Sequence, residues 1–262
     1  MTLKAIFNEF KSQVAFTLLL IWLLAIWHFQ TFNSLLYPLA AVGLMTALDL
    51  GITWIRSRKL YWPSASFVTG ALIGLILPPD GPILPIVAAC LAAWASKQFI
   101  NVGVRQHIFN PAAFGIMAAS LAFGSPVAWW AVAWGKLPLL ILVPLMIRIL
   151  WKMKRLMLPV SFLVIYYLFL ITFISPIDAS KALVDGSVLL FATVMLPEPI
   201  TSQSRGKFKY GFGILVAILA IGFSFLKLQE VFLPALLMAN LIGFLIPRFG
   251  KTSLKSPEAK SS

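Results

Sequence analysis

Two carboxylates, Asp80 and Glu198, each stand where an apolar run is closed by prolines, in Leu77-Pro78-Pro79-Asp80 and in Leu196-Pro197-Glu198-Pro199. Proline has no N–H group and disfavours helix in the residue before it, so a helix through either run must break there. A carboxylate at such a break can bind a cation or anchor freed backbone N–H groups. It can equally be an ordinary loop carboxylate at a water interface. Both residues are therefore candidate ion-binding or structural positions.

Asn110 is another candidate, because it directly precedes Pro111 in the stretch His107-Ile-Phe-Asn-Pro-Ala-Ala-Phe114. An asparagine there can cap a helix with its side-chain oxygen while its amide group still reaches a ligand. A related stretch, Glu230-Val-Phe-Leu-Pro-Ala-Leu-Leu237, carries Leu233 at the matching position. Because a helix of this kind can begin without the asparagine, we expect Asn110 to contact a ligand.

Asp49 and Lys136 are charged residues inside apolar runs. Polar groups at membrane depth are costly, which makes each one a functional hypothesis. Asp49 can equally be a paired or helix-capping carboxylate, and Lys136 can snorkel or mark a break, for which we favour a structural role. His107 follows Arg105 closely and is expected at the membrane interface. We expect no catalytic residue and no metal site.

The composition indicates an integral membrane protein. Of the 262 residues, 60% are hydrophobic and only 11% are charged, with a mean hydropathy of +0.94, whereas soluble domains carry about 25% charged residues. A transmembrane helix needs roughly 20 apolar residues. Candidate segments cover residues 13–31, 34–55, 64–77, 82–99, 109–123, 127–150, 157–175, 183–196, 210–226 and 230–247.

The positions of Lys and Arg predict the orientation. If all these segments cross the bilayer, most of the 21 basic residues fall in loops on the side of the N-terminus, which the positive-inside rule places in the cytoplasm. The net charge of +13 then reflects topology and attraction to lipid headgroups, and no nucleic acid is expected. We expect a cytoplasmic N-terminus at 1–12, five-helix units at 13–123 and 127–247, and a cytoplasmic, disordered tail at 248–262.

The paired breaks make those two units an internal repeat, a pattern that in transporters points to the binding site. Five spans per unit is an odd number, so the second unit must enter the membrane from the opposite side. Asp80 then lies toward the outer face and Glu198 toward the inner face. The third and eighth segments are too short to span alone, and unsatisfied backbone groups cannot face lipid. We therefore predict an all-α, N-in/C-in protein in which two broken half-helices form a central site.

Several motifs resemble the family of RnfD and NqrB, the membrane subunits of Rnf complexes and of sodium-translocating NADH:quinone oxidoreductases. They are Leu77-Pro-Pro-Asp-Gly-Pro82, Lys97-Gln98 and His107-Ile-Phe-Asn-Pro-Ala-Ala-Phe-Gly115. The stretch Leu196-Pro-Glu-Pro-Ile-Thr-Ser202, with the following Arg205-Gly-Lys-Phe-Lys-Tyr-Gly211, is similar to that family's Asp-Pro-Val-Thr segment and its trailing Gly and Tyr-Gly. The resemblance spans most of residues 60–245 in family order.

The resemblance implies two inverted five-helix repeats and electron transfer through membrane-held flavins. In that family a covalent FMN is attached to the Thr of a Ser-Gly-Ala-Thr motif facing outside, and a further flavin lies within the membrane part. This sequence has no Ser-Gly-Ala-Thr, and its nearest strings, Thr69-Gly-Ala71 and Phe191-Ala-Thr193, lie in apolar segments. No covalent FMN site is therefore expected.

The resulting hypothesis is a short RnfD/NqrB-like subunit in the inner (cytoplasmic) membrane. It would hold FMN or riboflavin noncovalently near the breaks and pass electrons to a flavinylated partner within a redox complex. Asn110, Thr69 and Thr201 would hydrogen-bond the flavin, and Lys97 and Pro111 of the matching motifs are assigned to the same site. The alternative is a channel or transporter for a small polar solute or cation through the repeat interface, with Asp80 and Glu198 as cation contacts.

Overall fold

A computed structural model of the chain describes residues 9–58, 61–101, 107–202 and 208–252, and all regular structure in these ranges is helical. They contain eleven α-helices and one π-helical turn. No strand occurs in them, and the only bridge-like pairing joins Asn101 to His107. The prediction of an all-helical protein is thus confirmed for the described residues. Of the tail predicted to be disordered at 248–262, residues 248–252 are helical and the rest lies outside these ranges.

Five helices precede residue 124, and three of them begin or end at a recognisable signal. Thr31 caps α3 by accepting a hydrogen bond from the Ser34 amide, α4 ends before the first pair of prolines, and Pro111 is the first residue of α6. The helices are α2 (Phe10–Phe29), α3 (Phe32–Ser57), α4 (Ser64–Ile76), α5 (Leu84–Phe99) and α6 (Pro111–Phe123).

The remaining helices follow the predicted segments with two differences. The predicted segment 127–150 is helical only from Leu137 onward, and a short helix, α9, lies in a predicted loop. The helices are α7 (Leu137–Lys152), α8 (Met157–Leu170), α9 (Pro176–Leu183), α10 (Gly186–Leu190), the π-helical turn η1 (Phe191–Met195), α11 (Phe208–Phe225) and α12 (Phe232–Thr252).

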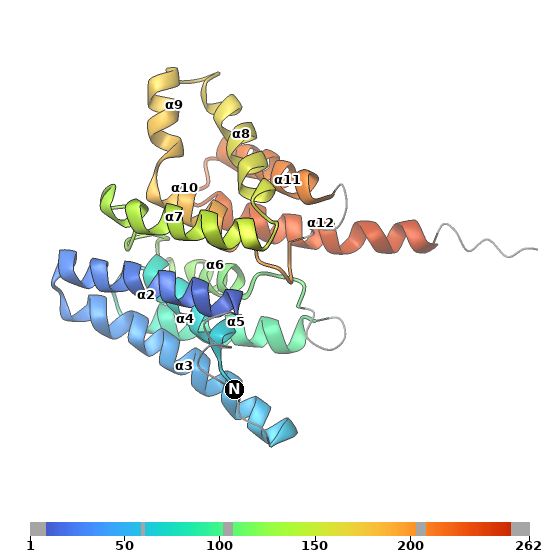
Figure 1. The fold of residues 1–262 in the computed structure, drawn as a ribbon. Coiled ribbons are helices and arrows are strands. Elements are labelled where there is room, and N and C mark those ends of the chain that lie inside the picture. Colours follow the sequence, from blue (N-terminus) through green and yellow to red (C-terminus); the bar gives the residue numbers. More distant parts are fainter. Residues whose placement is uncertain (1–8, 59–60, 102–106, 203–207, 253–262) are drawn as a thin grey trace, which may run out of the picture.

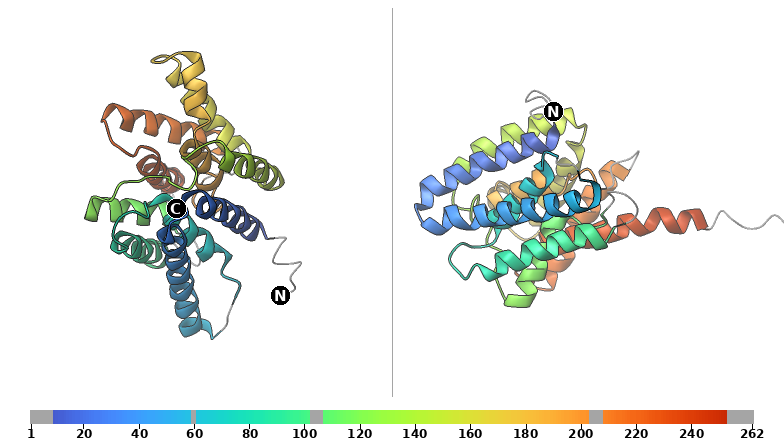
Figure 2. Two further views of the ribbon diagram at one scale, coloured as in Figure 1. Left: turned by 90° about the vertical axis from the view of Figure 1, so that its left-hand side faces the viewer. Right: turned by 90° about the horizontal axis from the view of Figure 1, so that it is seen from below.

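The two sets of helices form two neighbouring groups. Figure 1 shows α2 to α5 in the lower part of the view and α7 to α11 in the upper part, with α6 and α12 toward the middle. Within the first group α3 packs on α4 and α5 on α6, and within the second α11 packs on α8 and on α12. Between the groups α2 packs on α7, and α6 packs on α12. The left view of Figure 2 shows the same grouping.

The surface supports a membrane protein. Two helices, α2 and α3, are long and apolar enough to cross a membrane, and seven shorter stretches of helix are apolar as well. Large apolar side chains on them are well exposed, among them Phe32 at 72% and Leu121 at 82%. Soluble monomers rarely expose extensive apolar surface, whereas lipid tails accept it without cost.

Glycine allows α4 to lie directly against α3. A Cβ atom added to Gly74 would lie 2.8 Å from Cβ of Pro38 and closer still to its Cα, both on the facing helix. Close approach of backbones through small residues is typical of helix packing in membranes. This packing holds the first broken helix in the middle of the first group.

Candidate functional site

The first helix break is completed by a segment from elsewhere in the chain. After α4 ends, the carbonyl oxygen of Ile76 accepts hydrogen bonds from the amides of Ala128 (3.1 Å) and Trp129 (3.0 Å). The carbonyl of Leu75 accepts one from the amide of Ala131 (3.3 Å). Carbonyls left unpaired in an apolar environment would cost several kcal/mol each. This explains why part of the predicted segment 127–150 is not helical: its amides serve the end of α4.

The far side of this break is bound to α3. The Asn33 side-chain amide donates to the carbonyl of Pro79 (3.0 Å), and the Tyr37 hydroxyl donates to the carbonyl of Gly81 (2.6 Å). Asp80, in contrast, is exposed and forms no hydrogen bond or ion pair within the described residues. Its predicted role as an ion or structural residue stays a prediction.

The second helix break follows the π-helical turn. The amide of Leu196 donates to the carbonyl of Phe191 (3.0 Å), a bond that reaches one residue further than in an α-helix. Arg155, between α7 and α8, holds the residues that follow. Its guanidinium donates to the carbonyls of Pro197 (2.9 Å), Glu198 (3.2 Å) and Pro199 (3.3 Å), and to the Ser202 hydroxyl (2.6 Å).

The Glu198 side chain lies between a histidine and a threonine. Nε2 of His107 lies 3.3 Å from Oε1 of Glu198, and the Thr201 hydroxyl donates to Oε2 (2.9 Å). Only 6% of the His107 side chain is exposed, against 20% for Glu198. The sequence predicted His107 at the interface, whereas the structure buries it against the second break. This contact joins a residue before α6 to the loop after η1.

The environment of this break shifts two pKa values. Burial alone raises the pKa of Glu198, but the hydrogen bond and charge of His107, the charge of Lys11 and the Thr201 hydroxyl together lower it. Burial lowers the pKa of Arg155, while the negative charge of Glu198 acts in the opposite direction. The lowered pKa keeps Glu198 ionised at neutral pH, and the guanidinium of Arg155 keeps its charge as well, because the ordinary pKa of arginine lies far above neutral.

Asn110 joins α6 to the second break. Its Oδ1 accepts a hydrogen bond from the Ala113 amide (3.1 Å), which caps α6, and its Nδ2 donates to the carbonyl of Met195 (3.3 Å). Its backbone amide donates to Oδ1 of Asn240 on α12 (3.0 Å), and Nδ2 of Asn240 donates to the carbonyl of Thr201 (3.3 Å). Asn110 therefore caps its helix as anticipated. Its amide contacts protein here, so the ligand contact stays a prediction.

Glu230 takes the place of the cap that Leu233 cannot supply. Oε1 of Glu230 accepts hydrogen bonds from the amides of Phe232 (2.7 Å) and Leu233 (3.0 Å), at the start of α12. Oε2 accepts one from the indole N–H of Trp129 (2.9 Å). The helix after Glu230 thus does have a polar cap, supplied from a different position than in α6. The mismatch between Asn110 and Leu233 therefore gives weaker support to a ligand role than the sequence suggested.

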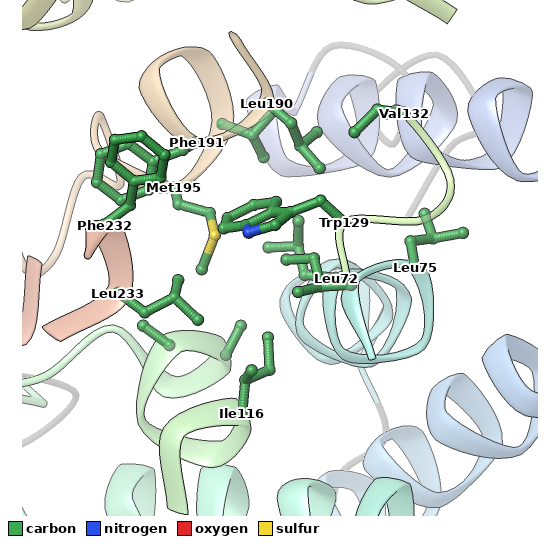
Figure 3. Close-up of a cluster of buried hydrophobic side chains, with 14 of the residues drawn as sticks. Leu72, Leu75, Ile116, Trp129, Val132, Leu190, Phe191, Met195, Phe232 and Leu233 are labelled. Atoms are coloured by element: carbon green, nitrogen blue, oxygen red, sulfur yellow. The ribbon is translucent and has the colours of Figure 1, made fainter. Parts of the chain in front are cut away.

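Apolar side chains fill the space between the two broken helices. Figure 3 shows the Trp129 ring between residues of α4 and residues of α10 and η1. All labelled side chains of this cluster are at most 8% exposed. They are Leu72, Leu75, Ile116, Trp129, Val132, Leu190, Phe191, Met195, Phe232 and Leu233. The central site predicted between the half-helices is thus packed with hydrocarbon and aromatic groups, and the polar groups lie at its two ends.

Asp49 forms a second polar cluster, which includes Lys97, a residue that the sequence assigned to the flavin site. One oxygen, Oδ2, accepts hydrogen bonds from the Lys97 ammonium, the Ser66 hydroxyl and the Tyr61 hydroxyl (3.0 Å for the last). The Asp49 side chain is 3% exposed and that of Lys97 21%. Burial and the charge of Asp49 raise the pKa of Tyr61. The pairing role of Asp49 is thus observed, while a flavin contact of Lys97 stays a prediction.

The other predicted flavin contacts lie in different surroundings. The Thr69 hydroxyl donates to the carbonyl of Ala65 in its own helix (3.0 Å) and is almost buried. Pro111 is the first residue of α6 and lies next to Asn110. The structure therefore brings Asn110, Pro111 and Thr201 together around the second break, whereas Lys97 belongs to the Asp49 cluster.

Sequence reasoning did not assign a site role to Arg155, Glu230, Trp129 or Asn240. Asn240 carried a usable signal, because it is a polar residue in the middle of the apolar segment 230–247. Arg155 was indistinguishable from the other basic residues of its loop. Among the described residues, no three His, Cys, Asp or Glu side chains group in a way that could hold a metal ion.

Comparison with known proteins finds similarity to one kind of membrane-complex subunit. The chain is 31% identical over 114 residues to the D-type subunit of the proton-translocating ferredoxin:NAD(+) oxidoreductase complex of Clostridium ljungdahlii, covering 42% of this chain and 33% of that protein. It is 25% identical over 111 residues to the D-type subunit of the ion-translocating oxidoreductase complex of Vibrio cholerae, covering 41% and 32%.

A further relative is the corresponding subunit of the ion-translocating oxidoreductase complex of Actinobacillus succinogenes, 23% identical over 106 residues, with 39% of this chain and 30% of that protein covered. The matching stretch thus spans about a third of the length of these curated relatives. No model of a known protein family matches the chain. The comparisons support the resemblance that the motifs indicate.

Proposed function

We propose that this chain is a membrane subunit of an electron-transport complex of the Rnf type, in the inner (cytoplasmic) membrane of a bacterial cell. The observation that carries the proposal is the 31% identity over 114 residues to the Clostridium ljungdahlii subunit. The relatives are named as subunits of oxidoreductase complexes, so the partners we propose are the other membrane and flavin-carrying subunits of such a complex. Coupling to ion movement is part of the proposal.

We further propose that the helices form two inverted repeats, α2 to α6 and α7 to α12. If the repeats are related by a twofold axis in the membrane plane, helices at matching positions meet each other across it. The contacts of α2 with α7 and of α6 with α12 agree with this, because each joins the first or the last helix of the two proposed repeats. Each break is also bound by residues of the other repeat, Trp129 at the first and Asn110 at the second.

The proposed alternation of the loops between the two sides of the membrane is supported by how the polar contacts sort into two ends, whereas the N-in/C-in orientation rests on the distribution of Lys and Arg. Contacts at one end join loops predicted to be inside: His107 with Glu198, and Arg155 with Pro197. The contact of Trp129 with Glu230 joins the first residues of two segments, 127–150 and 230–247, that are both predicted to enter the membrane from outside. Each of these contacts stays within its own end, as expected if both repeats span the same bilayer.

The noncovalent flavin does not fit between the breaks in this arrangement. The apolar cluster around Trp129 occupies that space, and the Asn110 amide, the Thr201 hydroxyl and the Lys97 ammonium are each bound to protein groups. We therefore derive no electron-transfer step through a flavin at this position. A flavin bound elsewhere on the chain or in its complex is still proposed, with the resemblance as its support.

The test is mild-detergent purification of the tagged full-length chain from native membranes grown with riboflavin. We expect other oxidoreductase subunits to be retained, identified by mass spectrometry, and a flavin absorption spectrum that bleaches on reduction and returns in air. Acid release of the flavin from the isolated chain would show that it is noncovalent. A chain that purifies alone, without flavin and without redox subunits, would overturn the proposal.

The channel alternative is less well supported, because apolar side chains at most 8% exposed fill the space between the breaks. A permeable path for a polar solute or cation needs polar or charged lining groups. Solute-dependent flux in proteoliposomes that contain this chain and no redox partner would favour the channel.

A further inference from the structure

The end of α3 carries two arginines that have no carboxylate partner in the part of the chain that the structure describes. Arg56 and Arg58 are both exposed, and neither takes part in the three ion pairs found in the described residues. Arg56 donates to Oε1 of Gln98 on α5 (3.0 Å), and the Arg58 guanidinium lies 5.8 Å from the centre of the Trp54 ring. Figure 2 shows this end of α3 projecting beyond the neighbouring helices.

The two acidic groups that contact α2, α3 and the start of α4 are already used. Asp49 accepts from Lys97, Ser66 and Tyr61, and Glu9 accepts from the hydroxyls of Ser12 (3.2 Å) and Ser64 (3.0 Å). The two guanidinium groups therefore carry positive charge that the described part of the chain does not neutralise. A cation in the last turn of a helix is favourable by itself, but that effect does not require two arginines beside exposed aromatic rings.

Aromatic side chains close to the arginines in the sequence expose their rings. Trp62 is 50% exposed, although its indole N–H donates a hydrogen bond to the Ser12 hydroxyl (3.2 Å). Tyr61 is 43% exposed, although its hydroxyl donates a hydrogen bond to Asp49. The polar atoms of both residues are bound inside the protein, so the exposed parts are apolar ring surface. Trp54, 45% exposed, adds a third ring on α3.

We propose that this surface, formed by Trp54, Arg56, Arg58, Tyr61 and Trp62, binds the headgroup of an anionic phospholipid. Arginine binds phosphate oxygens through parallel N–H donors in its planar guanidinium. Tryptophan and tyrosine rings favour the boundary between headgroups and acyl chains. The two properties together match a phospholipid with a net negative headgroup, and the lack of a neutralising carboxylate disfavours a zwitterionic one. The inference holds whether or not the chain carries electrons.

The experiment is native mass spectrometry of the delipidated full-length protein titrated with phosphatidylglycerol or phosphatidylcholine. We expect the first phosphatidylglycerol to bind more tightly than the first phosphatidylcholine. In Arg56→Gln/Arg58→Gln the affinity for phosphatidylglycerol falls by about five-fold per arginine removed, while the affinity for phosphatidylcholine stays the same. Arg56→Lys/Arg58→Lys keeps both charges but loses the planar donors, so it retains part of the preference.

The matched control is Arg148→Gln/Lys152→Gln, which removes two exposed charges from α7. It is expected to keep the preference for phosphatidylglycerol. Equal losses in both double variants, or no preference in the unaltered protein, would overturn the proposed site and leave only a general surface charge. If Arg56→Gln/Arg58→Gln fails to fold, the lysine variant, which keeps the charge, provides the comparison.

Discussion

Asn110 caps α6 with a carboxamide, whereas Glu230 caps α12 with a carboxyl group. The two groups differ in their hydrogen-bonding atoms, and this difference decides which partner each one binds in the other group of helices. A carboxamide has a donor as well as an acceptor, so Asn110 caps α6 and also donates to the carbonyl of Met195. The carboxyl group of Glu230 accepts with both oxygens, so one of them caps α12 and the other binds the indole N–H of Trp129. Each cap thereby binds a group at or next to the opposite break.

This chemistry predicts a graded effect of substitutions at Asn110. Asn110→Ser keeps a hydroxyl that can cap α6 but removes the side-chain donor to the buried carbonyl of Met195, which keeps only the longer bond from the Glu198 amide (3.4 Å), at a cost of about 0.5–1.5 kcal/mol. Asn110→Ala loses the cap as well, for about 1 kcal/mol more. Thermal unfolding of the purified protein in detergent should therefore rank the unaltered protein above the serine variant and the serine variant above the alanine variant.

Asn33→Ala is a suitable comparison, because Asn33 also donates to a carbonyl at a break but is only partly buried. It should cost less than Asn110→Ser. A serine variant as stable as the unaltered protein would mean that the bond to Met195 contributes little.

Single residues were predictable where their partner is close in the chain. The Asn-Pro pair indicated the cap at Asn110, which binds the amide of Ala113. The contact of His107 with Glu198 joins residues far apart in sequence, and nothing in either local pattern favoured it over an interfacial histidine. The contacts of Arg155 could not be predicted for the same reason, since only the folded chain brings this residue to the second break.

At the scale of elements, the broken helix α4 depends on glycine for its position. In Gly74→Ala the added Cβ would collide with the Pro38 backbone of α3, and such overpacking costs about 1–3 kcal/mol. Because α4 carries the first break, we expect a lower unfolding temperature and weaker amide hydrogen-exchange protection at residues 128–131.

Gly51→Ala supplies the control, since a Cβ at Gly51 meets nothing within 4 Å and Gly51 also lies inside α3. There alanine should be neutral or stabilising by up to about 1 kcal/mol, because glycine is a poor helix former. If both alanine variants behave alike, the close packing of α4 on α3 is not important for stability.

Most helix bounds followed from apolar length and proline positions, and the failures have physical reasons. The stretch before Leu137 is apolar enough for a helix, but its amides are used at the end of α4 instead. The short helix α9 does carry local signals, with Ser175 accepting from the Asp178 amide and Pro176 at the first position. The predicted segments passed over them because they were defined by apolar length alone.

At the scale of the whole molecule, the proposed topology places Asp80 and Lys152 on opposite sides of the membrane. Both residues are exposed, whereas Cys90, the sole cysteine, is buried. In a Cys90→Ser background, Asp80→Cys should react with a membrane-impermeant maleimide added to intact spheroplasts. Lys152→Cys should react only in inside-out vesicles.

Trp62→Cys extends this test to the first group of helices. The predicted loop that contains Trp62 is inside, so this cysteine should react only in inside-out vesicles. Labelling of all three cysteines from the same side would contradict the inverted arrangement. Reversal of all three would keep the arrangement but contradict the N-in orientation.

The bonds at the two breaks also impose an order on synthesis. The ribosome makes Asn110 and Arg155 before it makes η1, so the groups that complete the second break already exist when that break emerges. At the first break Asn33 and Tyr37 are made early, but the end of α4 has no such advantage, because the amides of Ala128 and Trp129 that bind Ile76 are made only after α5 and α6. During biogenesis the end of α4 must therefore wait for its partners in the translocon or in contact with water, and a nascent chain that stops before this segment keeps those carbonyls unpaired.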